Sequence, residues 1–168
     1  LQSGSDKILS SMHRGYNQKK YLSKIDMIKN IIPDVSLSSD VIVGFPGEDD
    51  ADFEETMKVV DYAEFDLIYM FKFSPRPGTV AADYSDKFVE KHLIDTRFMR
   101  LKEEQIKISQ NRYKRFVGST QQMLVEKPSK KDPNVLTGRI EGGHIVHLES
   151  TQNIIGQLID VKAVSYTH

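Results

Sequence analysis

The sequence predicts a two-part α/β chain, and three observations support this prediction. Strand-like and helix-like segments alternate up to about residue 116. Within this part, residues 40–48 are typical of a buried strand that leads through a glycine-rich turn into a helix. After Gly118 the helical patterns end, and short strand patterns replace them. We therefore expect a β/α domain at residues 1–116 and a small β domain at residues 117–168.

Composition limits the possible functions. A chain of 168 residues can bury a sizeable core, as one domain or as two small ones. Its net charge is −1, so any binding of nucleic acid has to use a local basic patch. It contains no cysteine, which excludes disulfides, thiolate metal ligands and a cysteine nucleophile. No apolar run has the length of a membrane helix and no signal peptide is visible, so we expect a cytoplasmic protein with no membrane partner.

The stretch at residues 40–48 is the element around which the first part is organised. Residues 41–43 are consecutive β-branched residues, a pattern typical of a strand covered on both faces. Gly44 begins the turn, and four acids at residues 48–52 follow at the expected helix start. These acids disfavour a bound phosphate, whereas a glycine beside an apolar strand edge suits a flat apolar group such as adenine. The alternative is that the glycines only form a tight loop.

The other elements of the first part follow from periodicity and capping residues. A short helix closes at Gly15, with Arg14 in its last turn, where a cation interacts favourably with the helix dipole. Asn17 is placed to cap a second helix, which ends before Pro33 and carries its lysines mainly on the solvated faces. Strands are expected at residues 35–43 and 66–74, and helices at residues 52–65 and 88–116.

The second part has the pattern of a small all-β domain. At least four short strands in about fifty residues predict a small β-barrel of the oligonucleotide-binding type. Lys130, Lys131, Arg139 and His144 are candidates for a basic face, and no group of residues has metal-ligand spacing. The expected strands are residues 121–126, 136–140, 144–148 and 158–164, with a Glu-Gly-Gly hairpin turn at residues 141–143.

Two further stretches have features of nucleic-acid contact. At residues 74–79, two prolines stiffen a loop at the carboxyl end of an expected strand and present Arg76. An ion pair between Arg76 and a nearby acid is the alternative. Residues 111–116, which include Arg112, interleave basic and aromatic side chains, a pattern that holds a phosphate backbone while bases stack. The attraction of cations to a helix C-terminus is the alternative there.

Four stretches, in this order, resemble the C-terminal part of the methylthiotransferases of the radical S-adenosylmethionine (radical SAM) class. They lie within residues 1–16 (LQSGS and MHRGY), at residues 42–48 (IVGFPGE), at residues 74–79 (SPRPGT) and at residues 129–139. The last stretch looks like the RNA-binding TRAM domain that ends these enzymes. The resemblance covers nearly the whole chain.

The resemblance implies a fold and a set of cofactors. The fold is α/β: the C-terminal part of a partial (β/α)6 TIM-like barrel, followed by a small OB-like β-barrel, the TRAM domain. The cofactors are S-adenosylmethionine and two 4Fe–4S clusters, whose cysteine ligands are absent from this chain. We therefore expect a fragment that is inactive alone, with a TRAM domain that is incomplete at its C-terminus.

The resemblance also implies residues that bind S-adenosylmethionine. Gln2 and Arg14 match a polar residue and an arginine that hold the methionine part in radical SAM barrels. Asp40 matches the residue that contacts the ribose. The adenine would be lined by Ile42, Gly44 and Phe73.

The loop at residues 74–79 resembles that of the tRNA enzyme that adds a methylthio group to carbon 2 of an isopentenyl-modified adenosine next to the anticodon. In that reaction a reduced cluster converts S-adenosylmethionine to a 5′-deoxyadenosyl radical, which removes the hydrogen at carbon 2, and a second cluster delivers sulfur. The implied partner is the tRNA anticodon stem-loop, and a monomer is favoured. Alternatives are relatives that modify threonylcarbamoyl-adenosine in tRNA or a ribosomal protein, and a non-catalytic RNA-binding module. The candidate RNA contacts are Arg76, Arg112, Lys130, Lys131 and Arg139.

Overall fold

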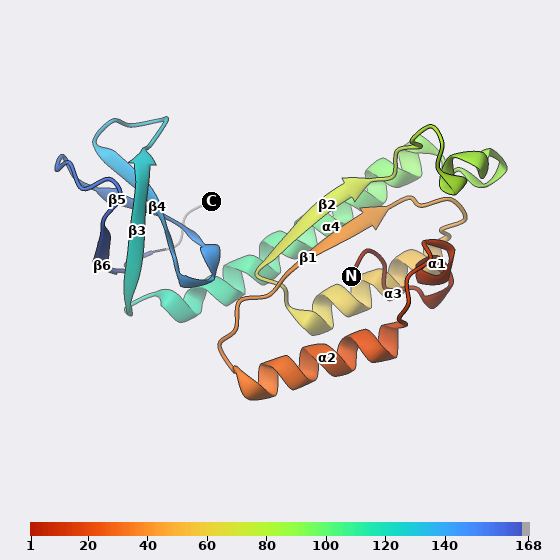
Figure 1. Cartoon of the computed structure of the whole chain (residues 1–168), viewed down its shortest axis with the longest axis horizontal. Coiled ribbons are helices and arrows are strands. Elements are labelled where there is room, and N and C mark those ends of the chain that lie inside the picture. Colours follow the sequence, from red (N-terminus) through yellow and green to blue (C-terminus); the bar gives the residue numbers. More distant parts are fainter. Residues whose placement is uncertain (166–168) are drawn as a thin grey trace. The chain divides into compact units, whose positions relative to one another are not determined.

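The computed structural model describes residues 1–165 of the chain (Figure 1). It divides the chain into two compact units, of which the first is Leu1–Arg112 and the second begins at Tyr113. The last three residues of the predicted second domain lie outside the described residues. The division lies close to the end of a long helix, α4 (Lys91–Tyr113).

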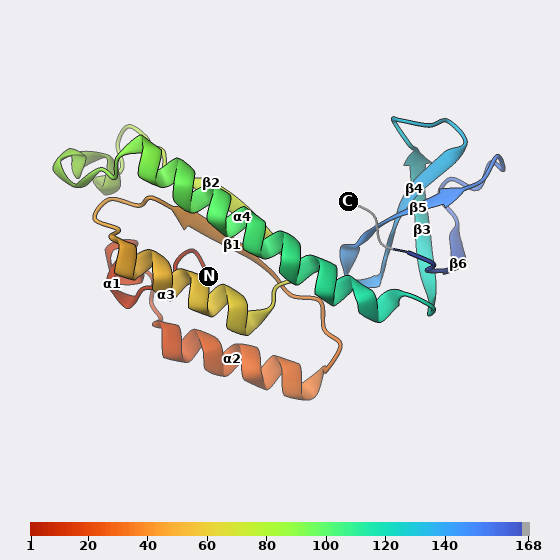
Figure 2. The same cartoon turned by 180° about the vertical axis from the view of Figure 1, so that it is seen from behind.

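In the first unit, two parallel strands have helices on one face. β1 (Ser38–Val43) and β2 (Leu67–Lys72) pair in register from end to end. α4 lies behind these strands in Figure 1 and in front of them in Figure 2. The remaining helices of this unit are α1 (Asp6–Ser11), α2 (Gln18–Ile31) and α3 (Asp50–Ala63), with short 3₁₀ turns at Val80–Asp83 and Ser85–Lys87 before α4.

Alternation along β1 determines which side chains enter the core. Val41 and Val43 are buried in a cluster with apolar residues of α3 and α4. Asp40, which points to the opposite face, is exposed, and Ile42 is half-buried. The prediction that this strand is covered on both faces is therefore wrong for the described chain, because the helices pack against one face only.

Side-chain caps begin the two long amphipathic helices of the first unit. Asn17 accepts the backbone N–H of Lys20 at 2.9 Å and caps α2, as the sequence predicted. α3 begins with a capping box, in which the carboxylates of Asp49 and Asp52 each accept the other residue's backbone N–H at 3.0 Å. The acids after Gly44 thus satisfy the helix start themselves.

The second unit contains one antiparallel sheet with the strand order β5-β4-β3-β6. Its core is formed by side chains of β3 and β4, Met123, Val125, Leu136 and Ile140. The four predicted strands are all present, but within the described residues neither sheet closes into a barrel. The prediction of a mixed α/β chain is confirmed, since the chain combines helices with two small sheets. The strands are β3 (Thr120–Pro128), β4 (Val135–Ile140), β5 (Ile145–Glu149) and β6 (Leu158–Lys162).

The N-terminal segment crosses α3 so closely that only glycine fits at residue 4. The Gly4 N–H donates to the Thr56 hydroxyl at 2.9 Å, and a Cβ at Gly4 would lie 2.5 Å from Thr56 Cα and overlap the Glu55 carbonyl oxygen. Since these are backbone atoms, we expect Gly4→Ala to lower the free energy of unfolding by about 2 kcal/mol or more, measured by urea denaturation.

Gly15→Ala is the matched control, because a Cβ at Gly15 meets no atom within 4 Å. It should leave the free energy of unfolding nearly unchanged or raise it slightly. Equal losses of stability for the two variants would contradict the close approach at Gly4.

Candidate functional site

The N-terminal residues extend the β1–β2 sheet by one backbone pairing. The Gln2 N–H donates to the Asp40 carbonyl at 2.7 Å, and the Ile42 N–H donates to the Gln2 carbonyl at 2.9 Å. These bonds form a parallel bridge opposite Val41. Gln2 has a φ of 68°, which is uncommon for a residue other than glycine. The bridge brings together three of the predicted cofactor residues, Gln2, Asp40 and Ile42.

The side chain of Gln2 is held by Tyr16, a residue for which the sequence predicted no role. The Tyr16 hydroxyl lies 3.0 Å from Gln2 Oε1 and 2.7 Å from the Leu1 carbonyl oxygen, and these two acceptors share its proton. Burial raises the pKa of Tyr16, which keeps the hydroxyl a donor, although the charge of Arg14 acts in the other direction. Among residues 1–165 the Gln2 amide NH₂ group has no hydrogen-bond partner, so it can donate to a ligand. The sequence signal for this role is weak, a tyrosine directly after a glycine turn.

Arg14 lies beyond the end of α1 and not in its last turn. His13 has a φ of 55°, and its N–H donates to the Ser10 carbonyl while the Arg14 N–H donates to the Leu9 carbonyl, both at 2.9 Å. This is a Schellman ending with histidine where glycine is usual. The helix therefore ends before the predicted Gly15, and the interpretation of Arg14 as a partner of the helix dipole is not supported.

Arg14 and Asp40 both lie close to Gln2. Burial raises the pKa of Tyr16, whose hydroxyl donates to Gln2, and the charge of Arg14 acts to lower it. The Asp40 carbonyl accepts the Gln2 N–H. Arg14 and Asp40 are exposed, and among residues 1–165 neither side chain has a hydrogen bond or an ion pair. The structure thus gathers Gln2, Arg14 and Asp40 around the bridge between Gln2 and β1.

The face of the sheet that carries Asp40 is open and partly aromatic. Asp40 is opposite Tyr69, and Ile42 is opposite Phe71. Tyr69 is 54% exposed and Phe71 is 51% exposed. A carboxylate beside apolar and aromatic side chains suits a ligand that combines hydroxyl groups with a flat ring. The two aromatic residues were predicted only as members of a strand.

Gly44 and Phe73 lie together at the carboxyl edge of the sheet. The Phe73 N–H donates to the Val43 carbonyl at 2.8 Å, and the Phe73 ring packs edge-on against Phe45 with centroids 5.3 Å apart. Gly44 is buried with a φ of 78°, and a Cβ on it would overlap Ile94 of α4. Gly44 and Phe73 thus lie just beyond the ends of β1 and β2, whereas Gln2, Asp40 and Ile42 meet at the bridge and Arg14 follows α1.

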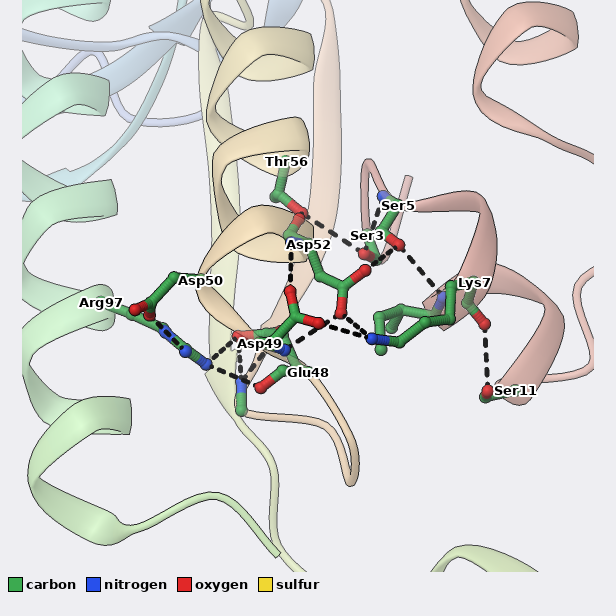
Figure 3. A network of polar contacts seen from close by, with 12 residues as sticks. Ser3, Ser5, Lys7, Ser11, Glu48, Asp49, Asp50, Asp52, Thr56 and Arg97 are labelled. Atoms are coloured by element: carbon green, nitrogen blue, oxygen red, sulfur yellow. Dashed lines mark hydrogen bonds and ion pairs between the residues drawn. The ribbon is translucent and has the colours of Figure 1, made fainter. Parts of the chain in front are cut away.

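The turn after β1 is held by two buried charges. The Gly44 N–H donates to both carboxylate oxygens of Glu48 at 3.2 Å. Arg97 donates through Nη1 to Glu48 Oε1 at 2.9 Å and to the Glu48 carbonyl at 3.1 Å (Figure 3). The Glu48 side chain is 2% exposed and that of Arg97 is 7% exposed. Burial raises the pKa of Glu48, and the Gly44 N–H and Arg97 partly offset this. Neither Glu48 nor Arg97 was a predicted site residue.

A second polar network joins α1 to the start of α3. Lys7 lies 2.8 Å from Asp49 Oδ2 and 2.5 Å from Asp52 Oδ2, and the Ser5 hydroxyl donates to Asp52 at 2.6 Å (Figure 3). The hydrogen bond from Lys7 lowers the pKa of Asp49 to about 2. Because the helix start is occupied by its own carboxylates, it offers no place for a phosphate, as the acid-rich sequence indicated.

A pocket of about 460 Å³ lies beside the same turn. It is lined by residues of the turn and of the segment before α4, among them Gly47, Glu48, Lys87, Phe88 and Arg97. The Gly47 N–H donates to the Lys87 carbonyl at 2.8 Å and closes one side. No predicted cofactor residue lines this pocket.

The two arginines predicted as RNA contacts in the first unit differ in their surroundings. Arg76 is exposed, its carbonyl accepts the Thr79 hydroxyl at 2.8 Å, and its guanidinium has no partner among residues 1–165. Arg112 donates to Asp66 Oδ2 at 3.2 Å and to the Val35 carbonyl at 2.9 Å. Arg112 therefore already has a structural role, in which it ties α4 to the segments that precede β1 and β2.

In the second unit, Lys130 and Lys131 are exposed in the loop between β3 and β4. The Lys131 backbone N–H donates to the Ser129 hydroxyl at 3.2 Å, which forms a short turn in this loop. The Lys131 side chain is exposed. Arg139 of β4 donates to Glu126 at 3.1 Å and to the Gly143 carbonyl at 3.0 Å. The two lysines are thus the more available cations of this unit's predicted set.

The aromatic residues of the stretch at 111–116 are used for packing. The rings of Tyr113 and Phe116 lie 5.2 Å and 5.0 Å from that of His144, and Arg115 stacks on Phe116 at 4.8 Å. These contacts connect the end of α4 to the turn before β5. They give the stretch a structural reason for its mixture of basic and aromatic residues.

The described part of the chain has neither a metal-binding cluster nor a membrane-spanning helix. Residues 1–165 contain no group of three or more His, Cys, Asp or Glu residues that could hold a metal ion. In the same residues no helix has the length and apolar character needed to cross a membrane.

Comparison with known proteins identifies relatives for both units. Residues 1–60 match the model of the Radical SAM superfamily. The chain is 46% identical to the tRNA-2-methylthio-N(6)-dimethylallyladenosine synthase of Alteromonas mediterranea, over 96% of this chain and 34% of that protein. For proteins of the same name, the identity is 46% in Vibrio cholerae, over 98% of this chain and 34% of the relative, and 43% in Clostridium botulinum, over 98% and 36%.

The resemblance to radical SAM methylthiotransferases is confirmed. The chain spans about a third of the length of the curated relatives it matches. The similarity continues well beyond the residues matched by the superfamily model, so it includes the loop that carries Arg76 and the second unit.

The raised pKa of Glu48 predicts how stability changes with pH. A carboxyl whose pKa is higher in the folded state stabilises the fold when protonated, and this contribution is lost as the pH rises from 4.5 through the raised value. Glutamine at this position cannot ionise. We therefore expect the unfolding free energy of Glu48→Gln, relative to the unsubstituted protein, to rise as the pH increases from 4.5 through the raised pKa of Glu48, measured by urea denaturation.

Glu54→Gln is the control of opposite sign. The hydrogen bond from Arg100 lowers the pKa of the exposed Glu54, so its ionised form favours folding at pH values above 4.5. This advantage over glutamine should be lost as the pH falls. A Glu48→Gln difference that is independent of pH, or that has the sign of the Glu54 control, would contradict the raised pKa of Glu48.

Proposed function

We propose that the chain is part of a tRNA methylthiotransferase that acts on N6-dimethylallyl-adenosine. The similarity to relatives of that name, which extends along both units, is the observation that carries the proposal. The activity proposed for the whole protein is the addition of a methylthio group to carbon 2 of the modified base, in the anticodon stem-loop of tRNA. A protein that modifies tRNA would act in the cytoplasm.

At the level of architecture, the first unit would be the C-terminal part of a partial (β/α)6 barrel. Its parallel β1–β2 pair, with helices on one face and an open opposite face, supports this proposal. The second unit would be the TRAM domain, at residues 117–168 of the predicted division. Its four short antiparallel strands support that proposal.

The chemistry of the open sheet face fits S-adenosylmethionine. The Asp40 carboxylate, which has no partner among residues 1–165, can accept hydrogen bonds from ribose hydroxyls. The Gln2 amide and the Arg14 guanidinium can hold the polar methionine part, and Tyr16 orients Gln2. The adenine would lie toward Ile42, Gly44 and Phe73.

S-adenosylmethionine, when bound next to a reduced iron–sulfur cluster, would supply the radical chemistry that breaks a C–H bond. The residues of this chain would bind and orient it on the sheet face. The chain has no cysteine, so the thiolate ligands of the two proposed 4Fe–4S clusters would come from other residues of the whole protein.

The proposed RNA contacts are the exposed cations that the fold leaves available. Arg76 is presented by a loop stiffened by prolines, and Lys130 and Lys131 lie in an exposed loop of the second unit. Arg139 is a further candidate, although it already contacts Glu126. A base that is modified in the anticodon loop has to leave its stack, and cations that hold the RNA backbone favour this.

Asp40→Ala in the full-length protein should weaken S-adenosylmethionine binding about tenfold, because the ribose hydroxyls lose a charged acceptor. Isothermal titration calorimetry measures this affinity. Asp61→Asn, which changes an exposed acid on α3, is the control and should leave the affinity unchanged. Unchanged affinity in Asp40→Ala would refute the ribose contact.

Arg76→Ala, combined with Lys130→Ala and Lys131→Ala, should weaken tRNA binding and lower its dependence on salt. Each lost phosphate contact reduces the slope of log affinity against log salt by about 0.7 to 0.9. Filter binding at several salt concentrations measures both quantities. Lys19→Ala with Lys24→Ala, two exposed lysines of α2, should change neither. Equal effects of the two sets would show only a general loss of positive charge.

A further inference from the structure

The turn between β1 and α3 contains two glycines whose conformation has to be fixed by contacts with other residues. Gly44 has a φ of 78° and Gly47 has a φ of 80°. Glycine reaches this conformation without strain, but it also has more alternative conformations than any other residue. The Gly44 N–H therefore needs a fixed acceptor if the end of β1 is to hold one orientation.

Glu48 is that acceptor. Both of its carboxylate oxygens lie 3.2 Å from the Gly44 nitrogen, so the side chain folds back over the turn that precedes it. The carboxylate is almost fully buried, and a buried charge persists only when it is paired and hydrogen-bonded. The Gly44 N–H provides one part of this compensation.

Arg97 provides the rest from α4. Its Nη1 donates to the carboxylate and to the backbone carbonyl of Glu48, and its Nη2 donates to Asp50 at 2.7 Å. The guanidinium thus grips both the side chain and the main chain of Glu48, together with the start of α3. Figure 3 shows Arg97 reaching from α4 toward Glu48 and Asp50. A lysine, with a single nitrogen, does not reproduce this planar set of donors.

α4 contacts the turn at a second point, one helical turn earlier. Ile94 fills the space beside Gly44, where a Cβ would overlap its Cγ1 and lie 2.7 Å from its Cδ1. Ile94 and Arg97 are on the same face of α4, because residues three apart are neighbours on a helix. One helix face therefore shapes the turn by packing and by charge.

We propose that Arg97 is a positioning residue for the cofactor site, and that it acts through Glu48 to hold Gly44 and the carboxyl end of β1 in the orientation that receives the adenine. This inference rests on the proposed function and deepens it. Arg97 does not touch the cofactor. It contributes by keeping the glycine turn in one conformation before the cofactor arrives, which lowers the ordering cost of binding.

The test uses Arg97→Gln in the full-length protein, with two measurements. Hydrogen exchange of the peptide that contains residues 44–48 should be about tenfold faster. The reason is that Glu48, the acceptor of the Gly44 N–H, is no longer held in place by Arg97. The dissociation constant for S-adenosylmethionine, measured by calorimetry, should rise about tenfold. Unfolding monitored by circular dichroism shows whether the variant remains folded at the assay temperature.

Arg100→Gln is the matched control, since Arg100 lies on the same helix and pairs with the exposed Glu54. It should change neither the exchange of the turn nor the affinity. If Arg97→Gln does not fold, Arg97→Lys keeps the buried stem and the charge while it loses the planar donor set, and it is judged by the same two measurements.

The outcomes separate this inference from the proposed function. Faster exchange of the turn with unchanged affinity would overturn the positioning role, while a weakened Asp40→Ala variant would leave the proposed cofactor site standing. Unchanged affinity in both Arg97→Gln and Asp40→Ala would overturn the cofactor site itself. Faster exchange together with weaker binding, in Arg97→Gln alone of the two α4 variants, supports the inference.

Discussion

The first unit depends on the one-sided burial of a parallel pair of strands. Because successive side chains of a strand point to opposite faces, burying Val41 and Val43 under α3 and α4 forces Asp40 and Ile42 onto the other face. The parallel register carries the same division to β2. A face with a carboxylate and exposed aromatic rings is thus a direct consequence of core formation.

Two polar networks hold the turn that follows this strand pair. Lys7 reaches the start of α3 from α1, and Arg97 reaches Glu48 from α4. The first pair of contacts is partly exposed to solvent and contributes little by itself. The contact between Arg97 and Glu48 is buried, so removal of either partner would leave a desolvated charge without its partner and would destabilise the turn. The contact from α4 therefore stabilises the turn more than the contacts from α1 do.

Much of the fold was predictable from local sequence. Asn17 marked the start of α2, the acids after Gly44 marked the start of α3, and the short β patterns after Gly118 marked the strands of the second unit. The end of α1 was missed because His13 adopts a left-handed conformation that glycine usually supplies. The prediction of a strand covered on both faces failed because apolar runs do not reveal what packs against them.

In the candidate site, too, some features follow from local sequence and others depend on tertiary packing. The sequence by itself determined which segments form strands and helices, in which order they come, and that Arg76, Lys130 and Lys131 are in exposed loops. Only the tertiary structure decided that Arg112 pairs with Asp66 and that Arg97 grips Glu48, contacts that span 46 and 49 residues of chain. The physical reason is that capping and periodicity act between near neighbours, whereas the partner of a buried charge is set by which elements pack together.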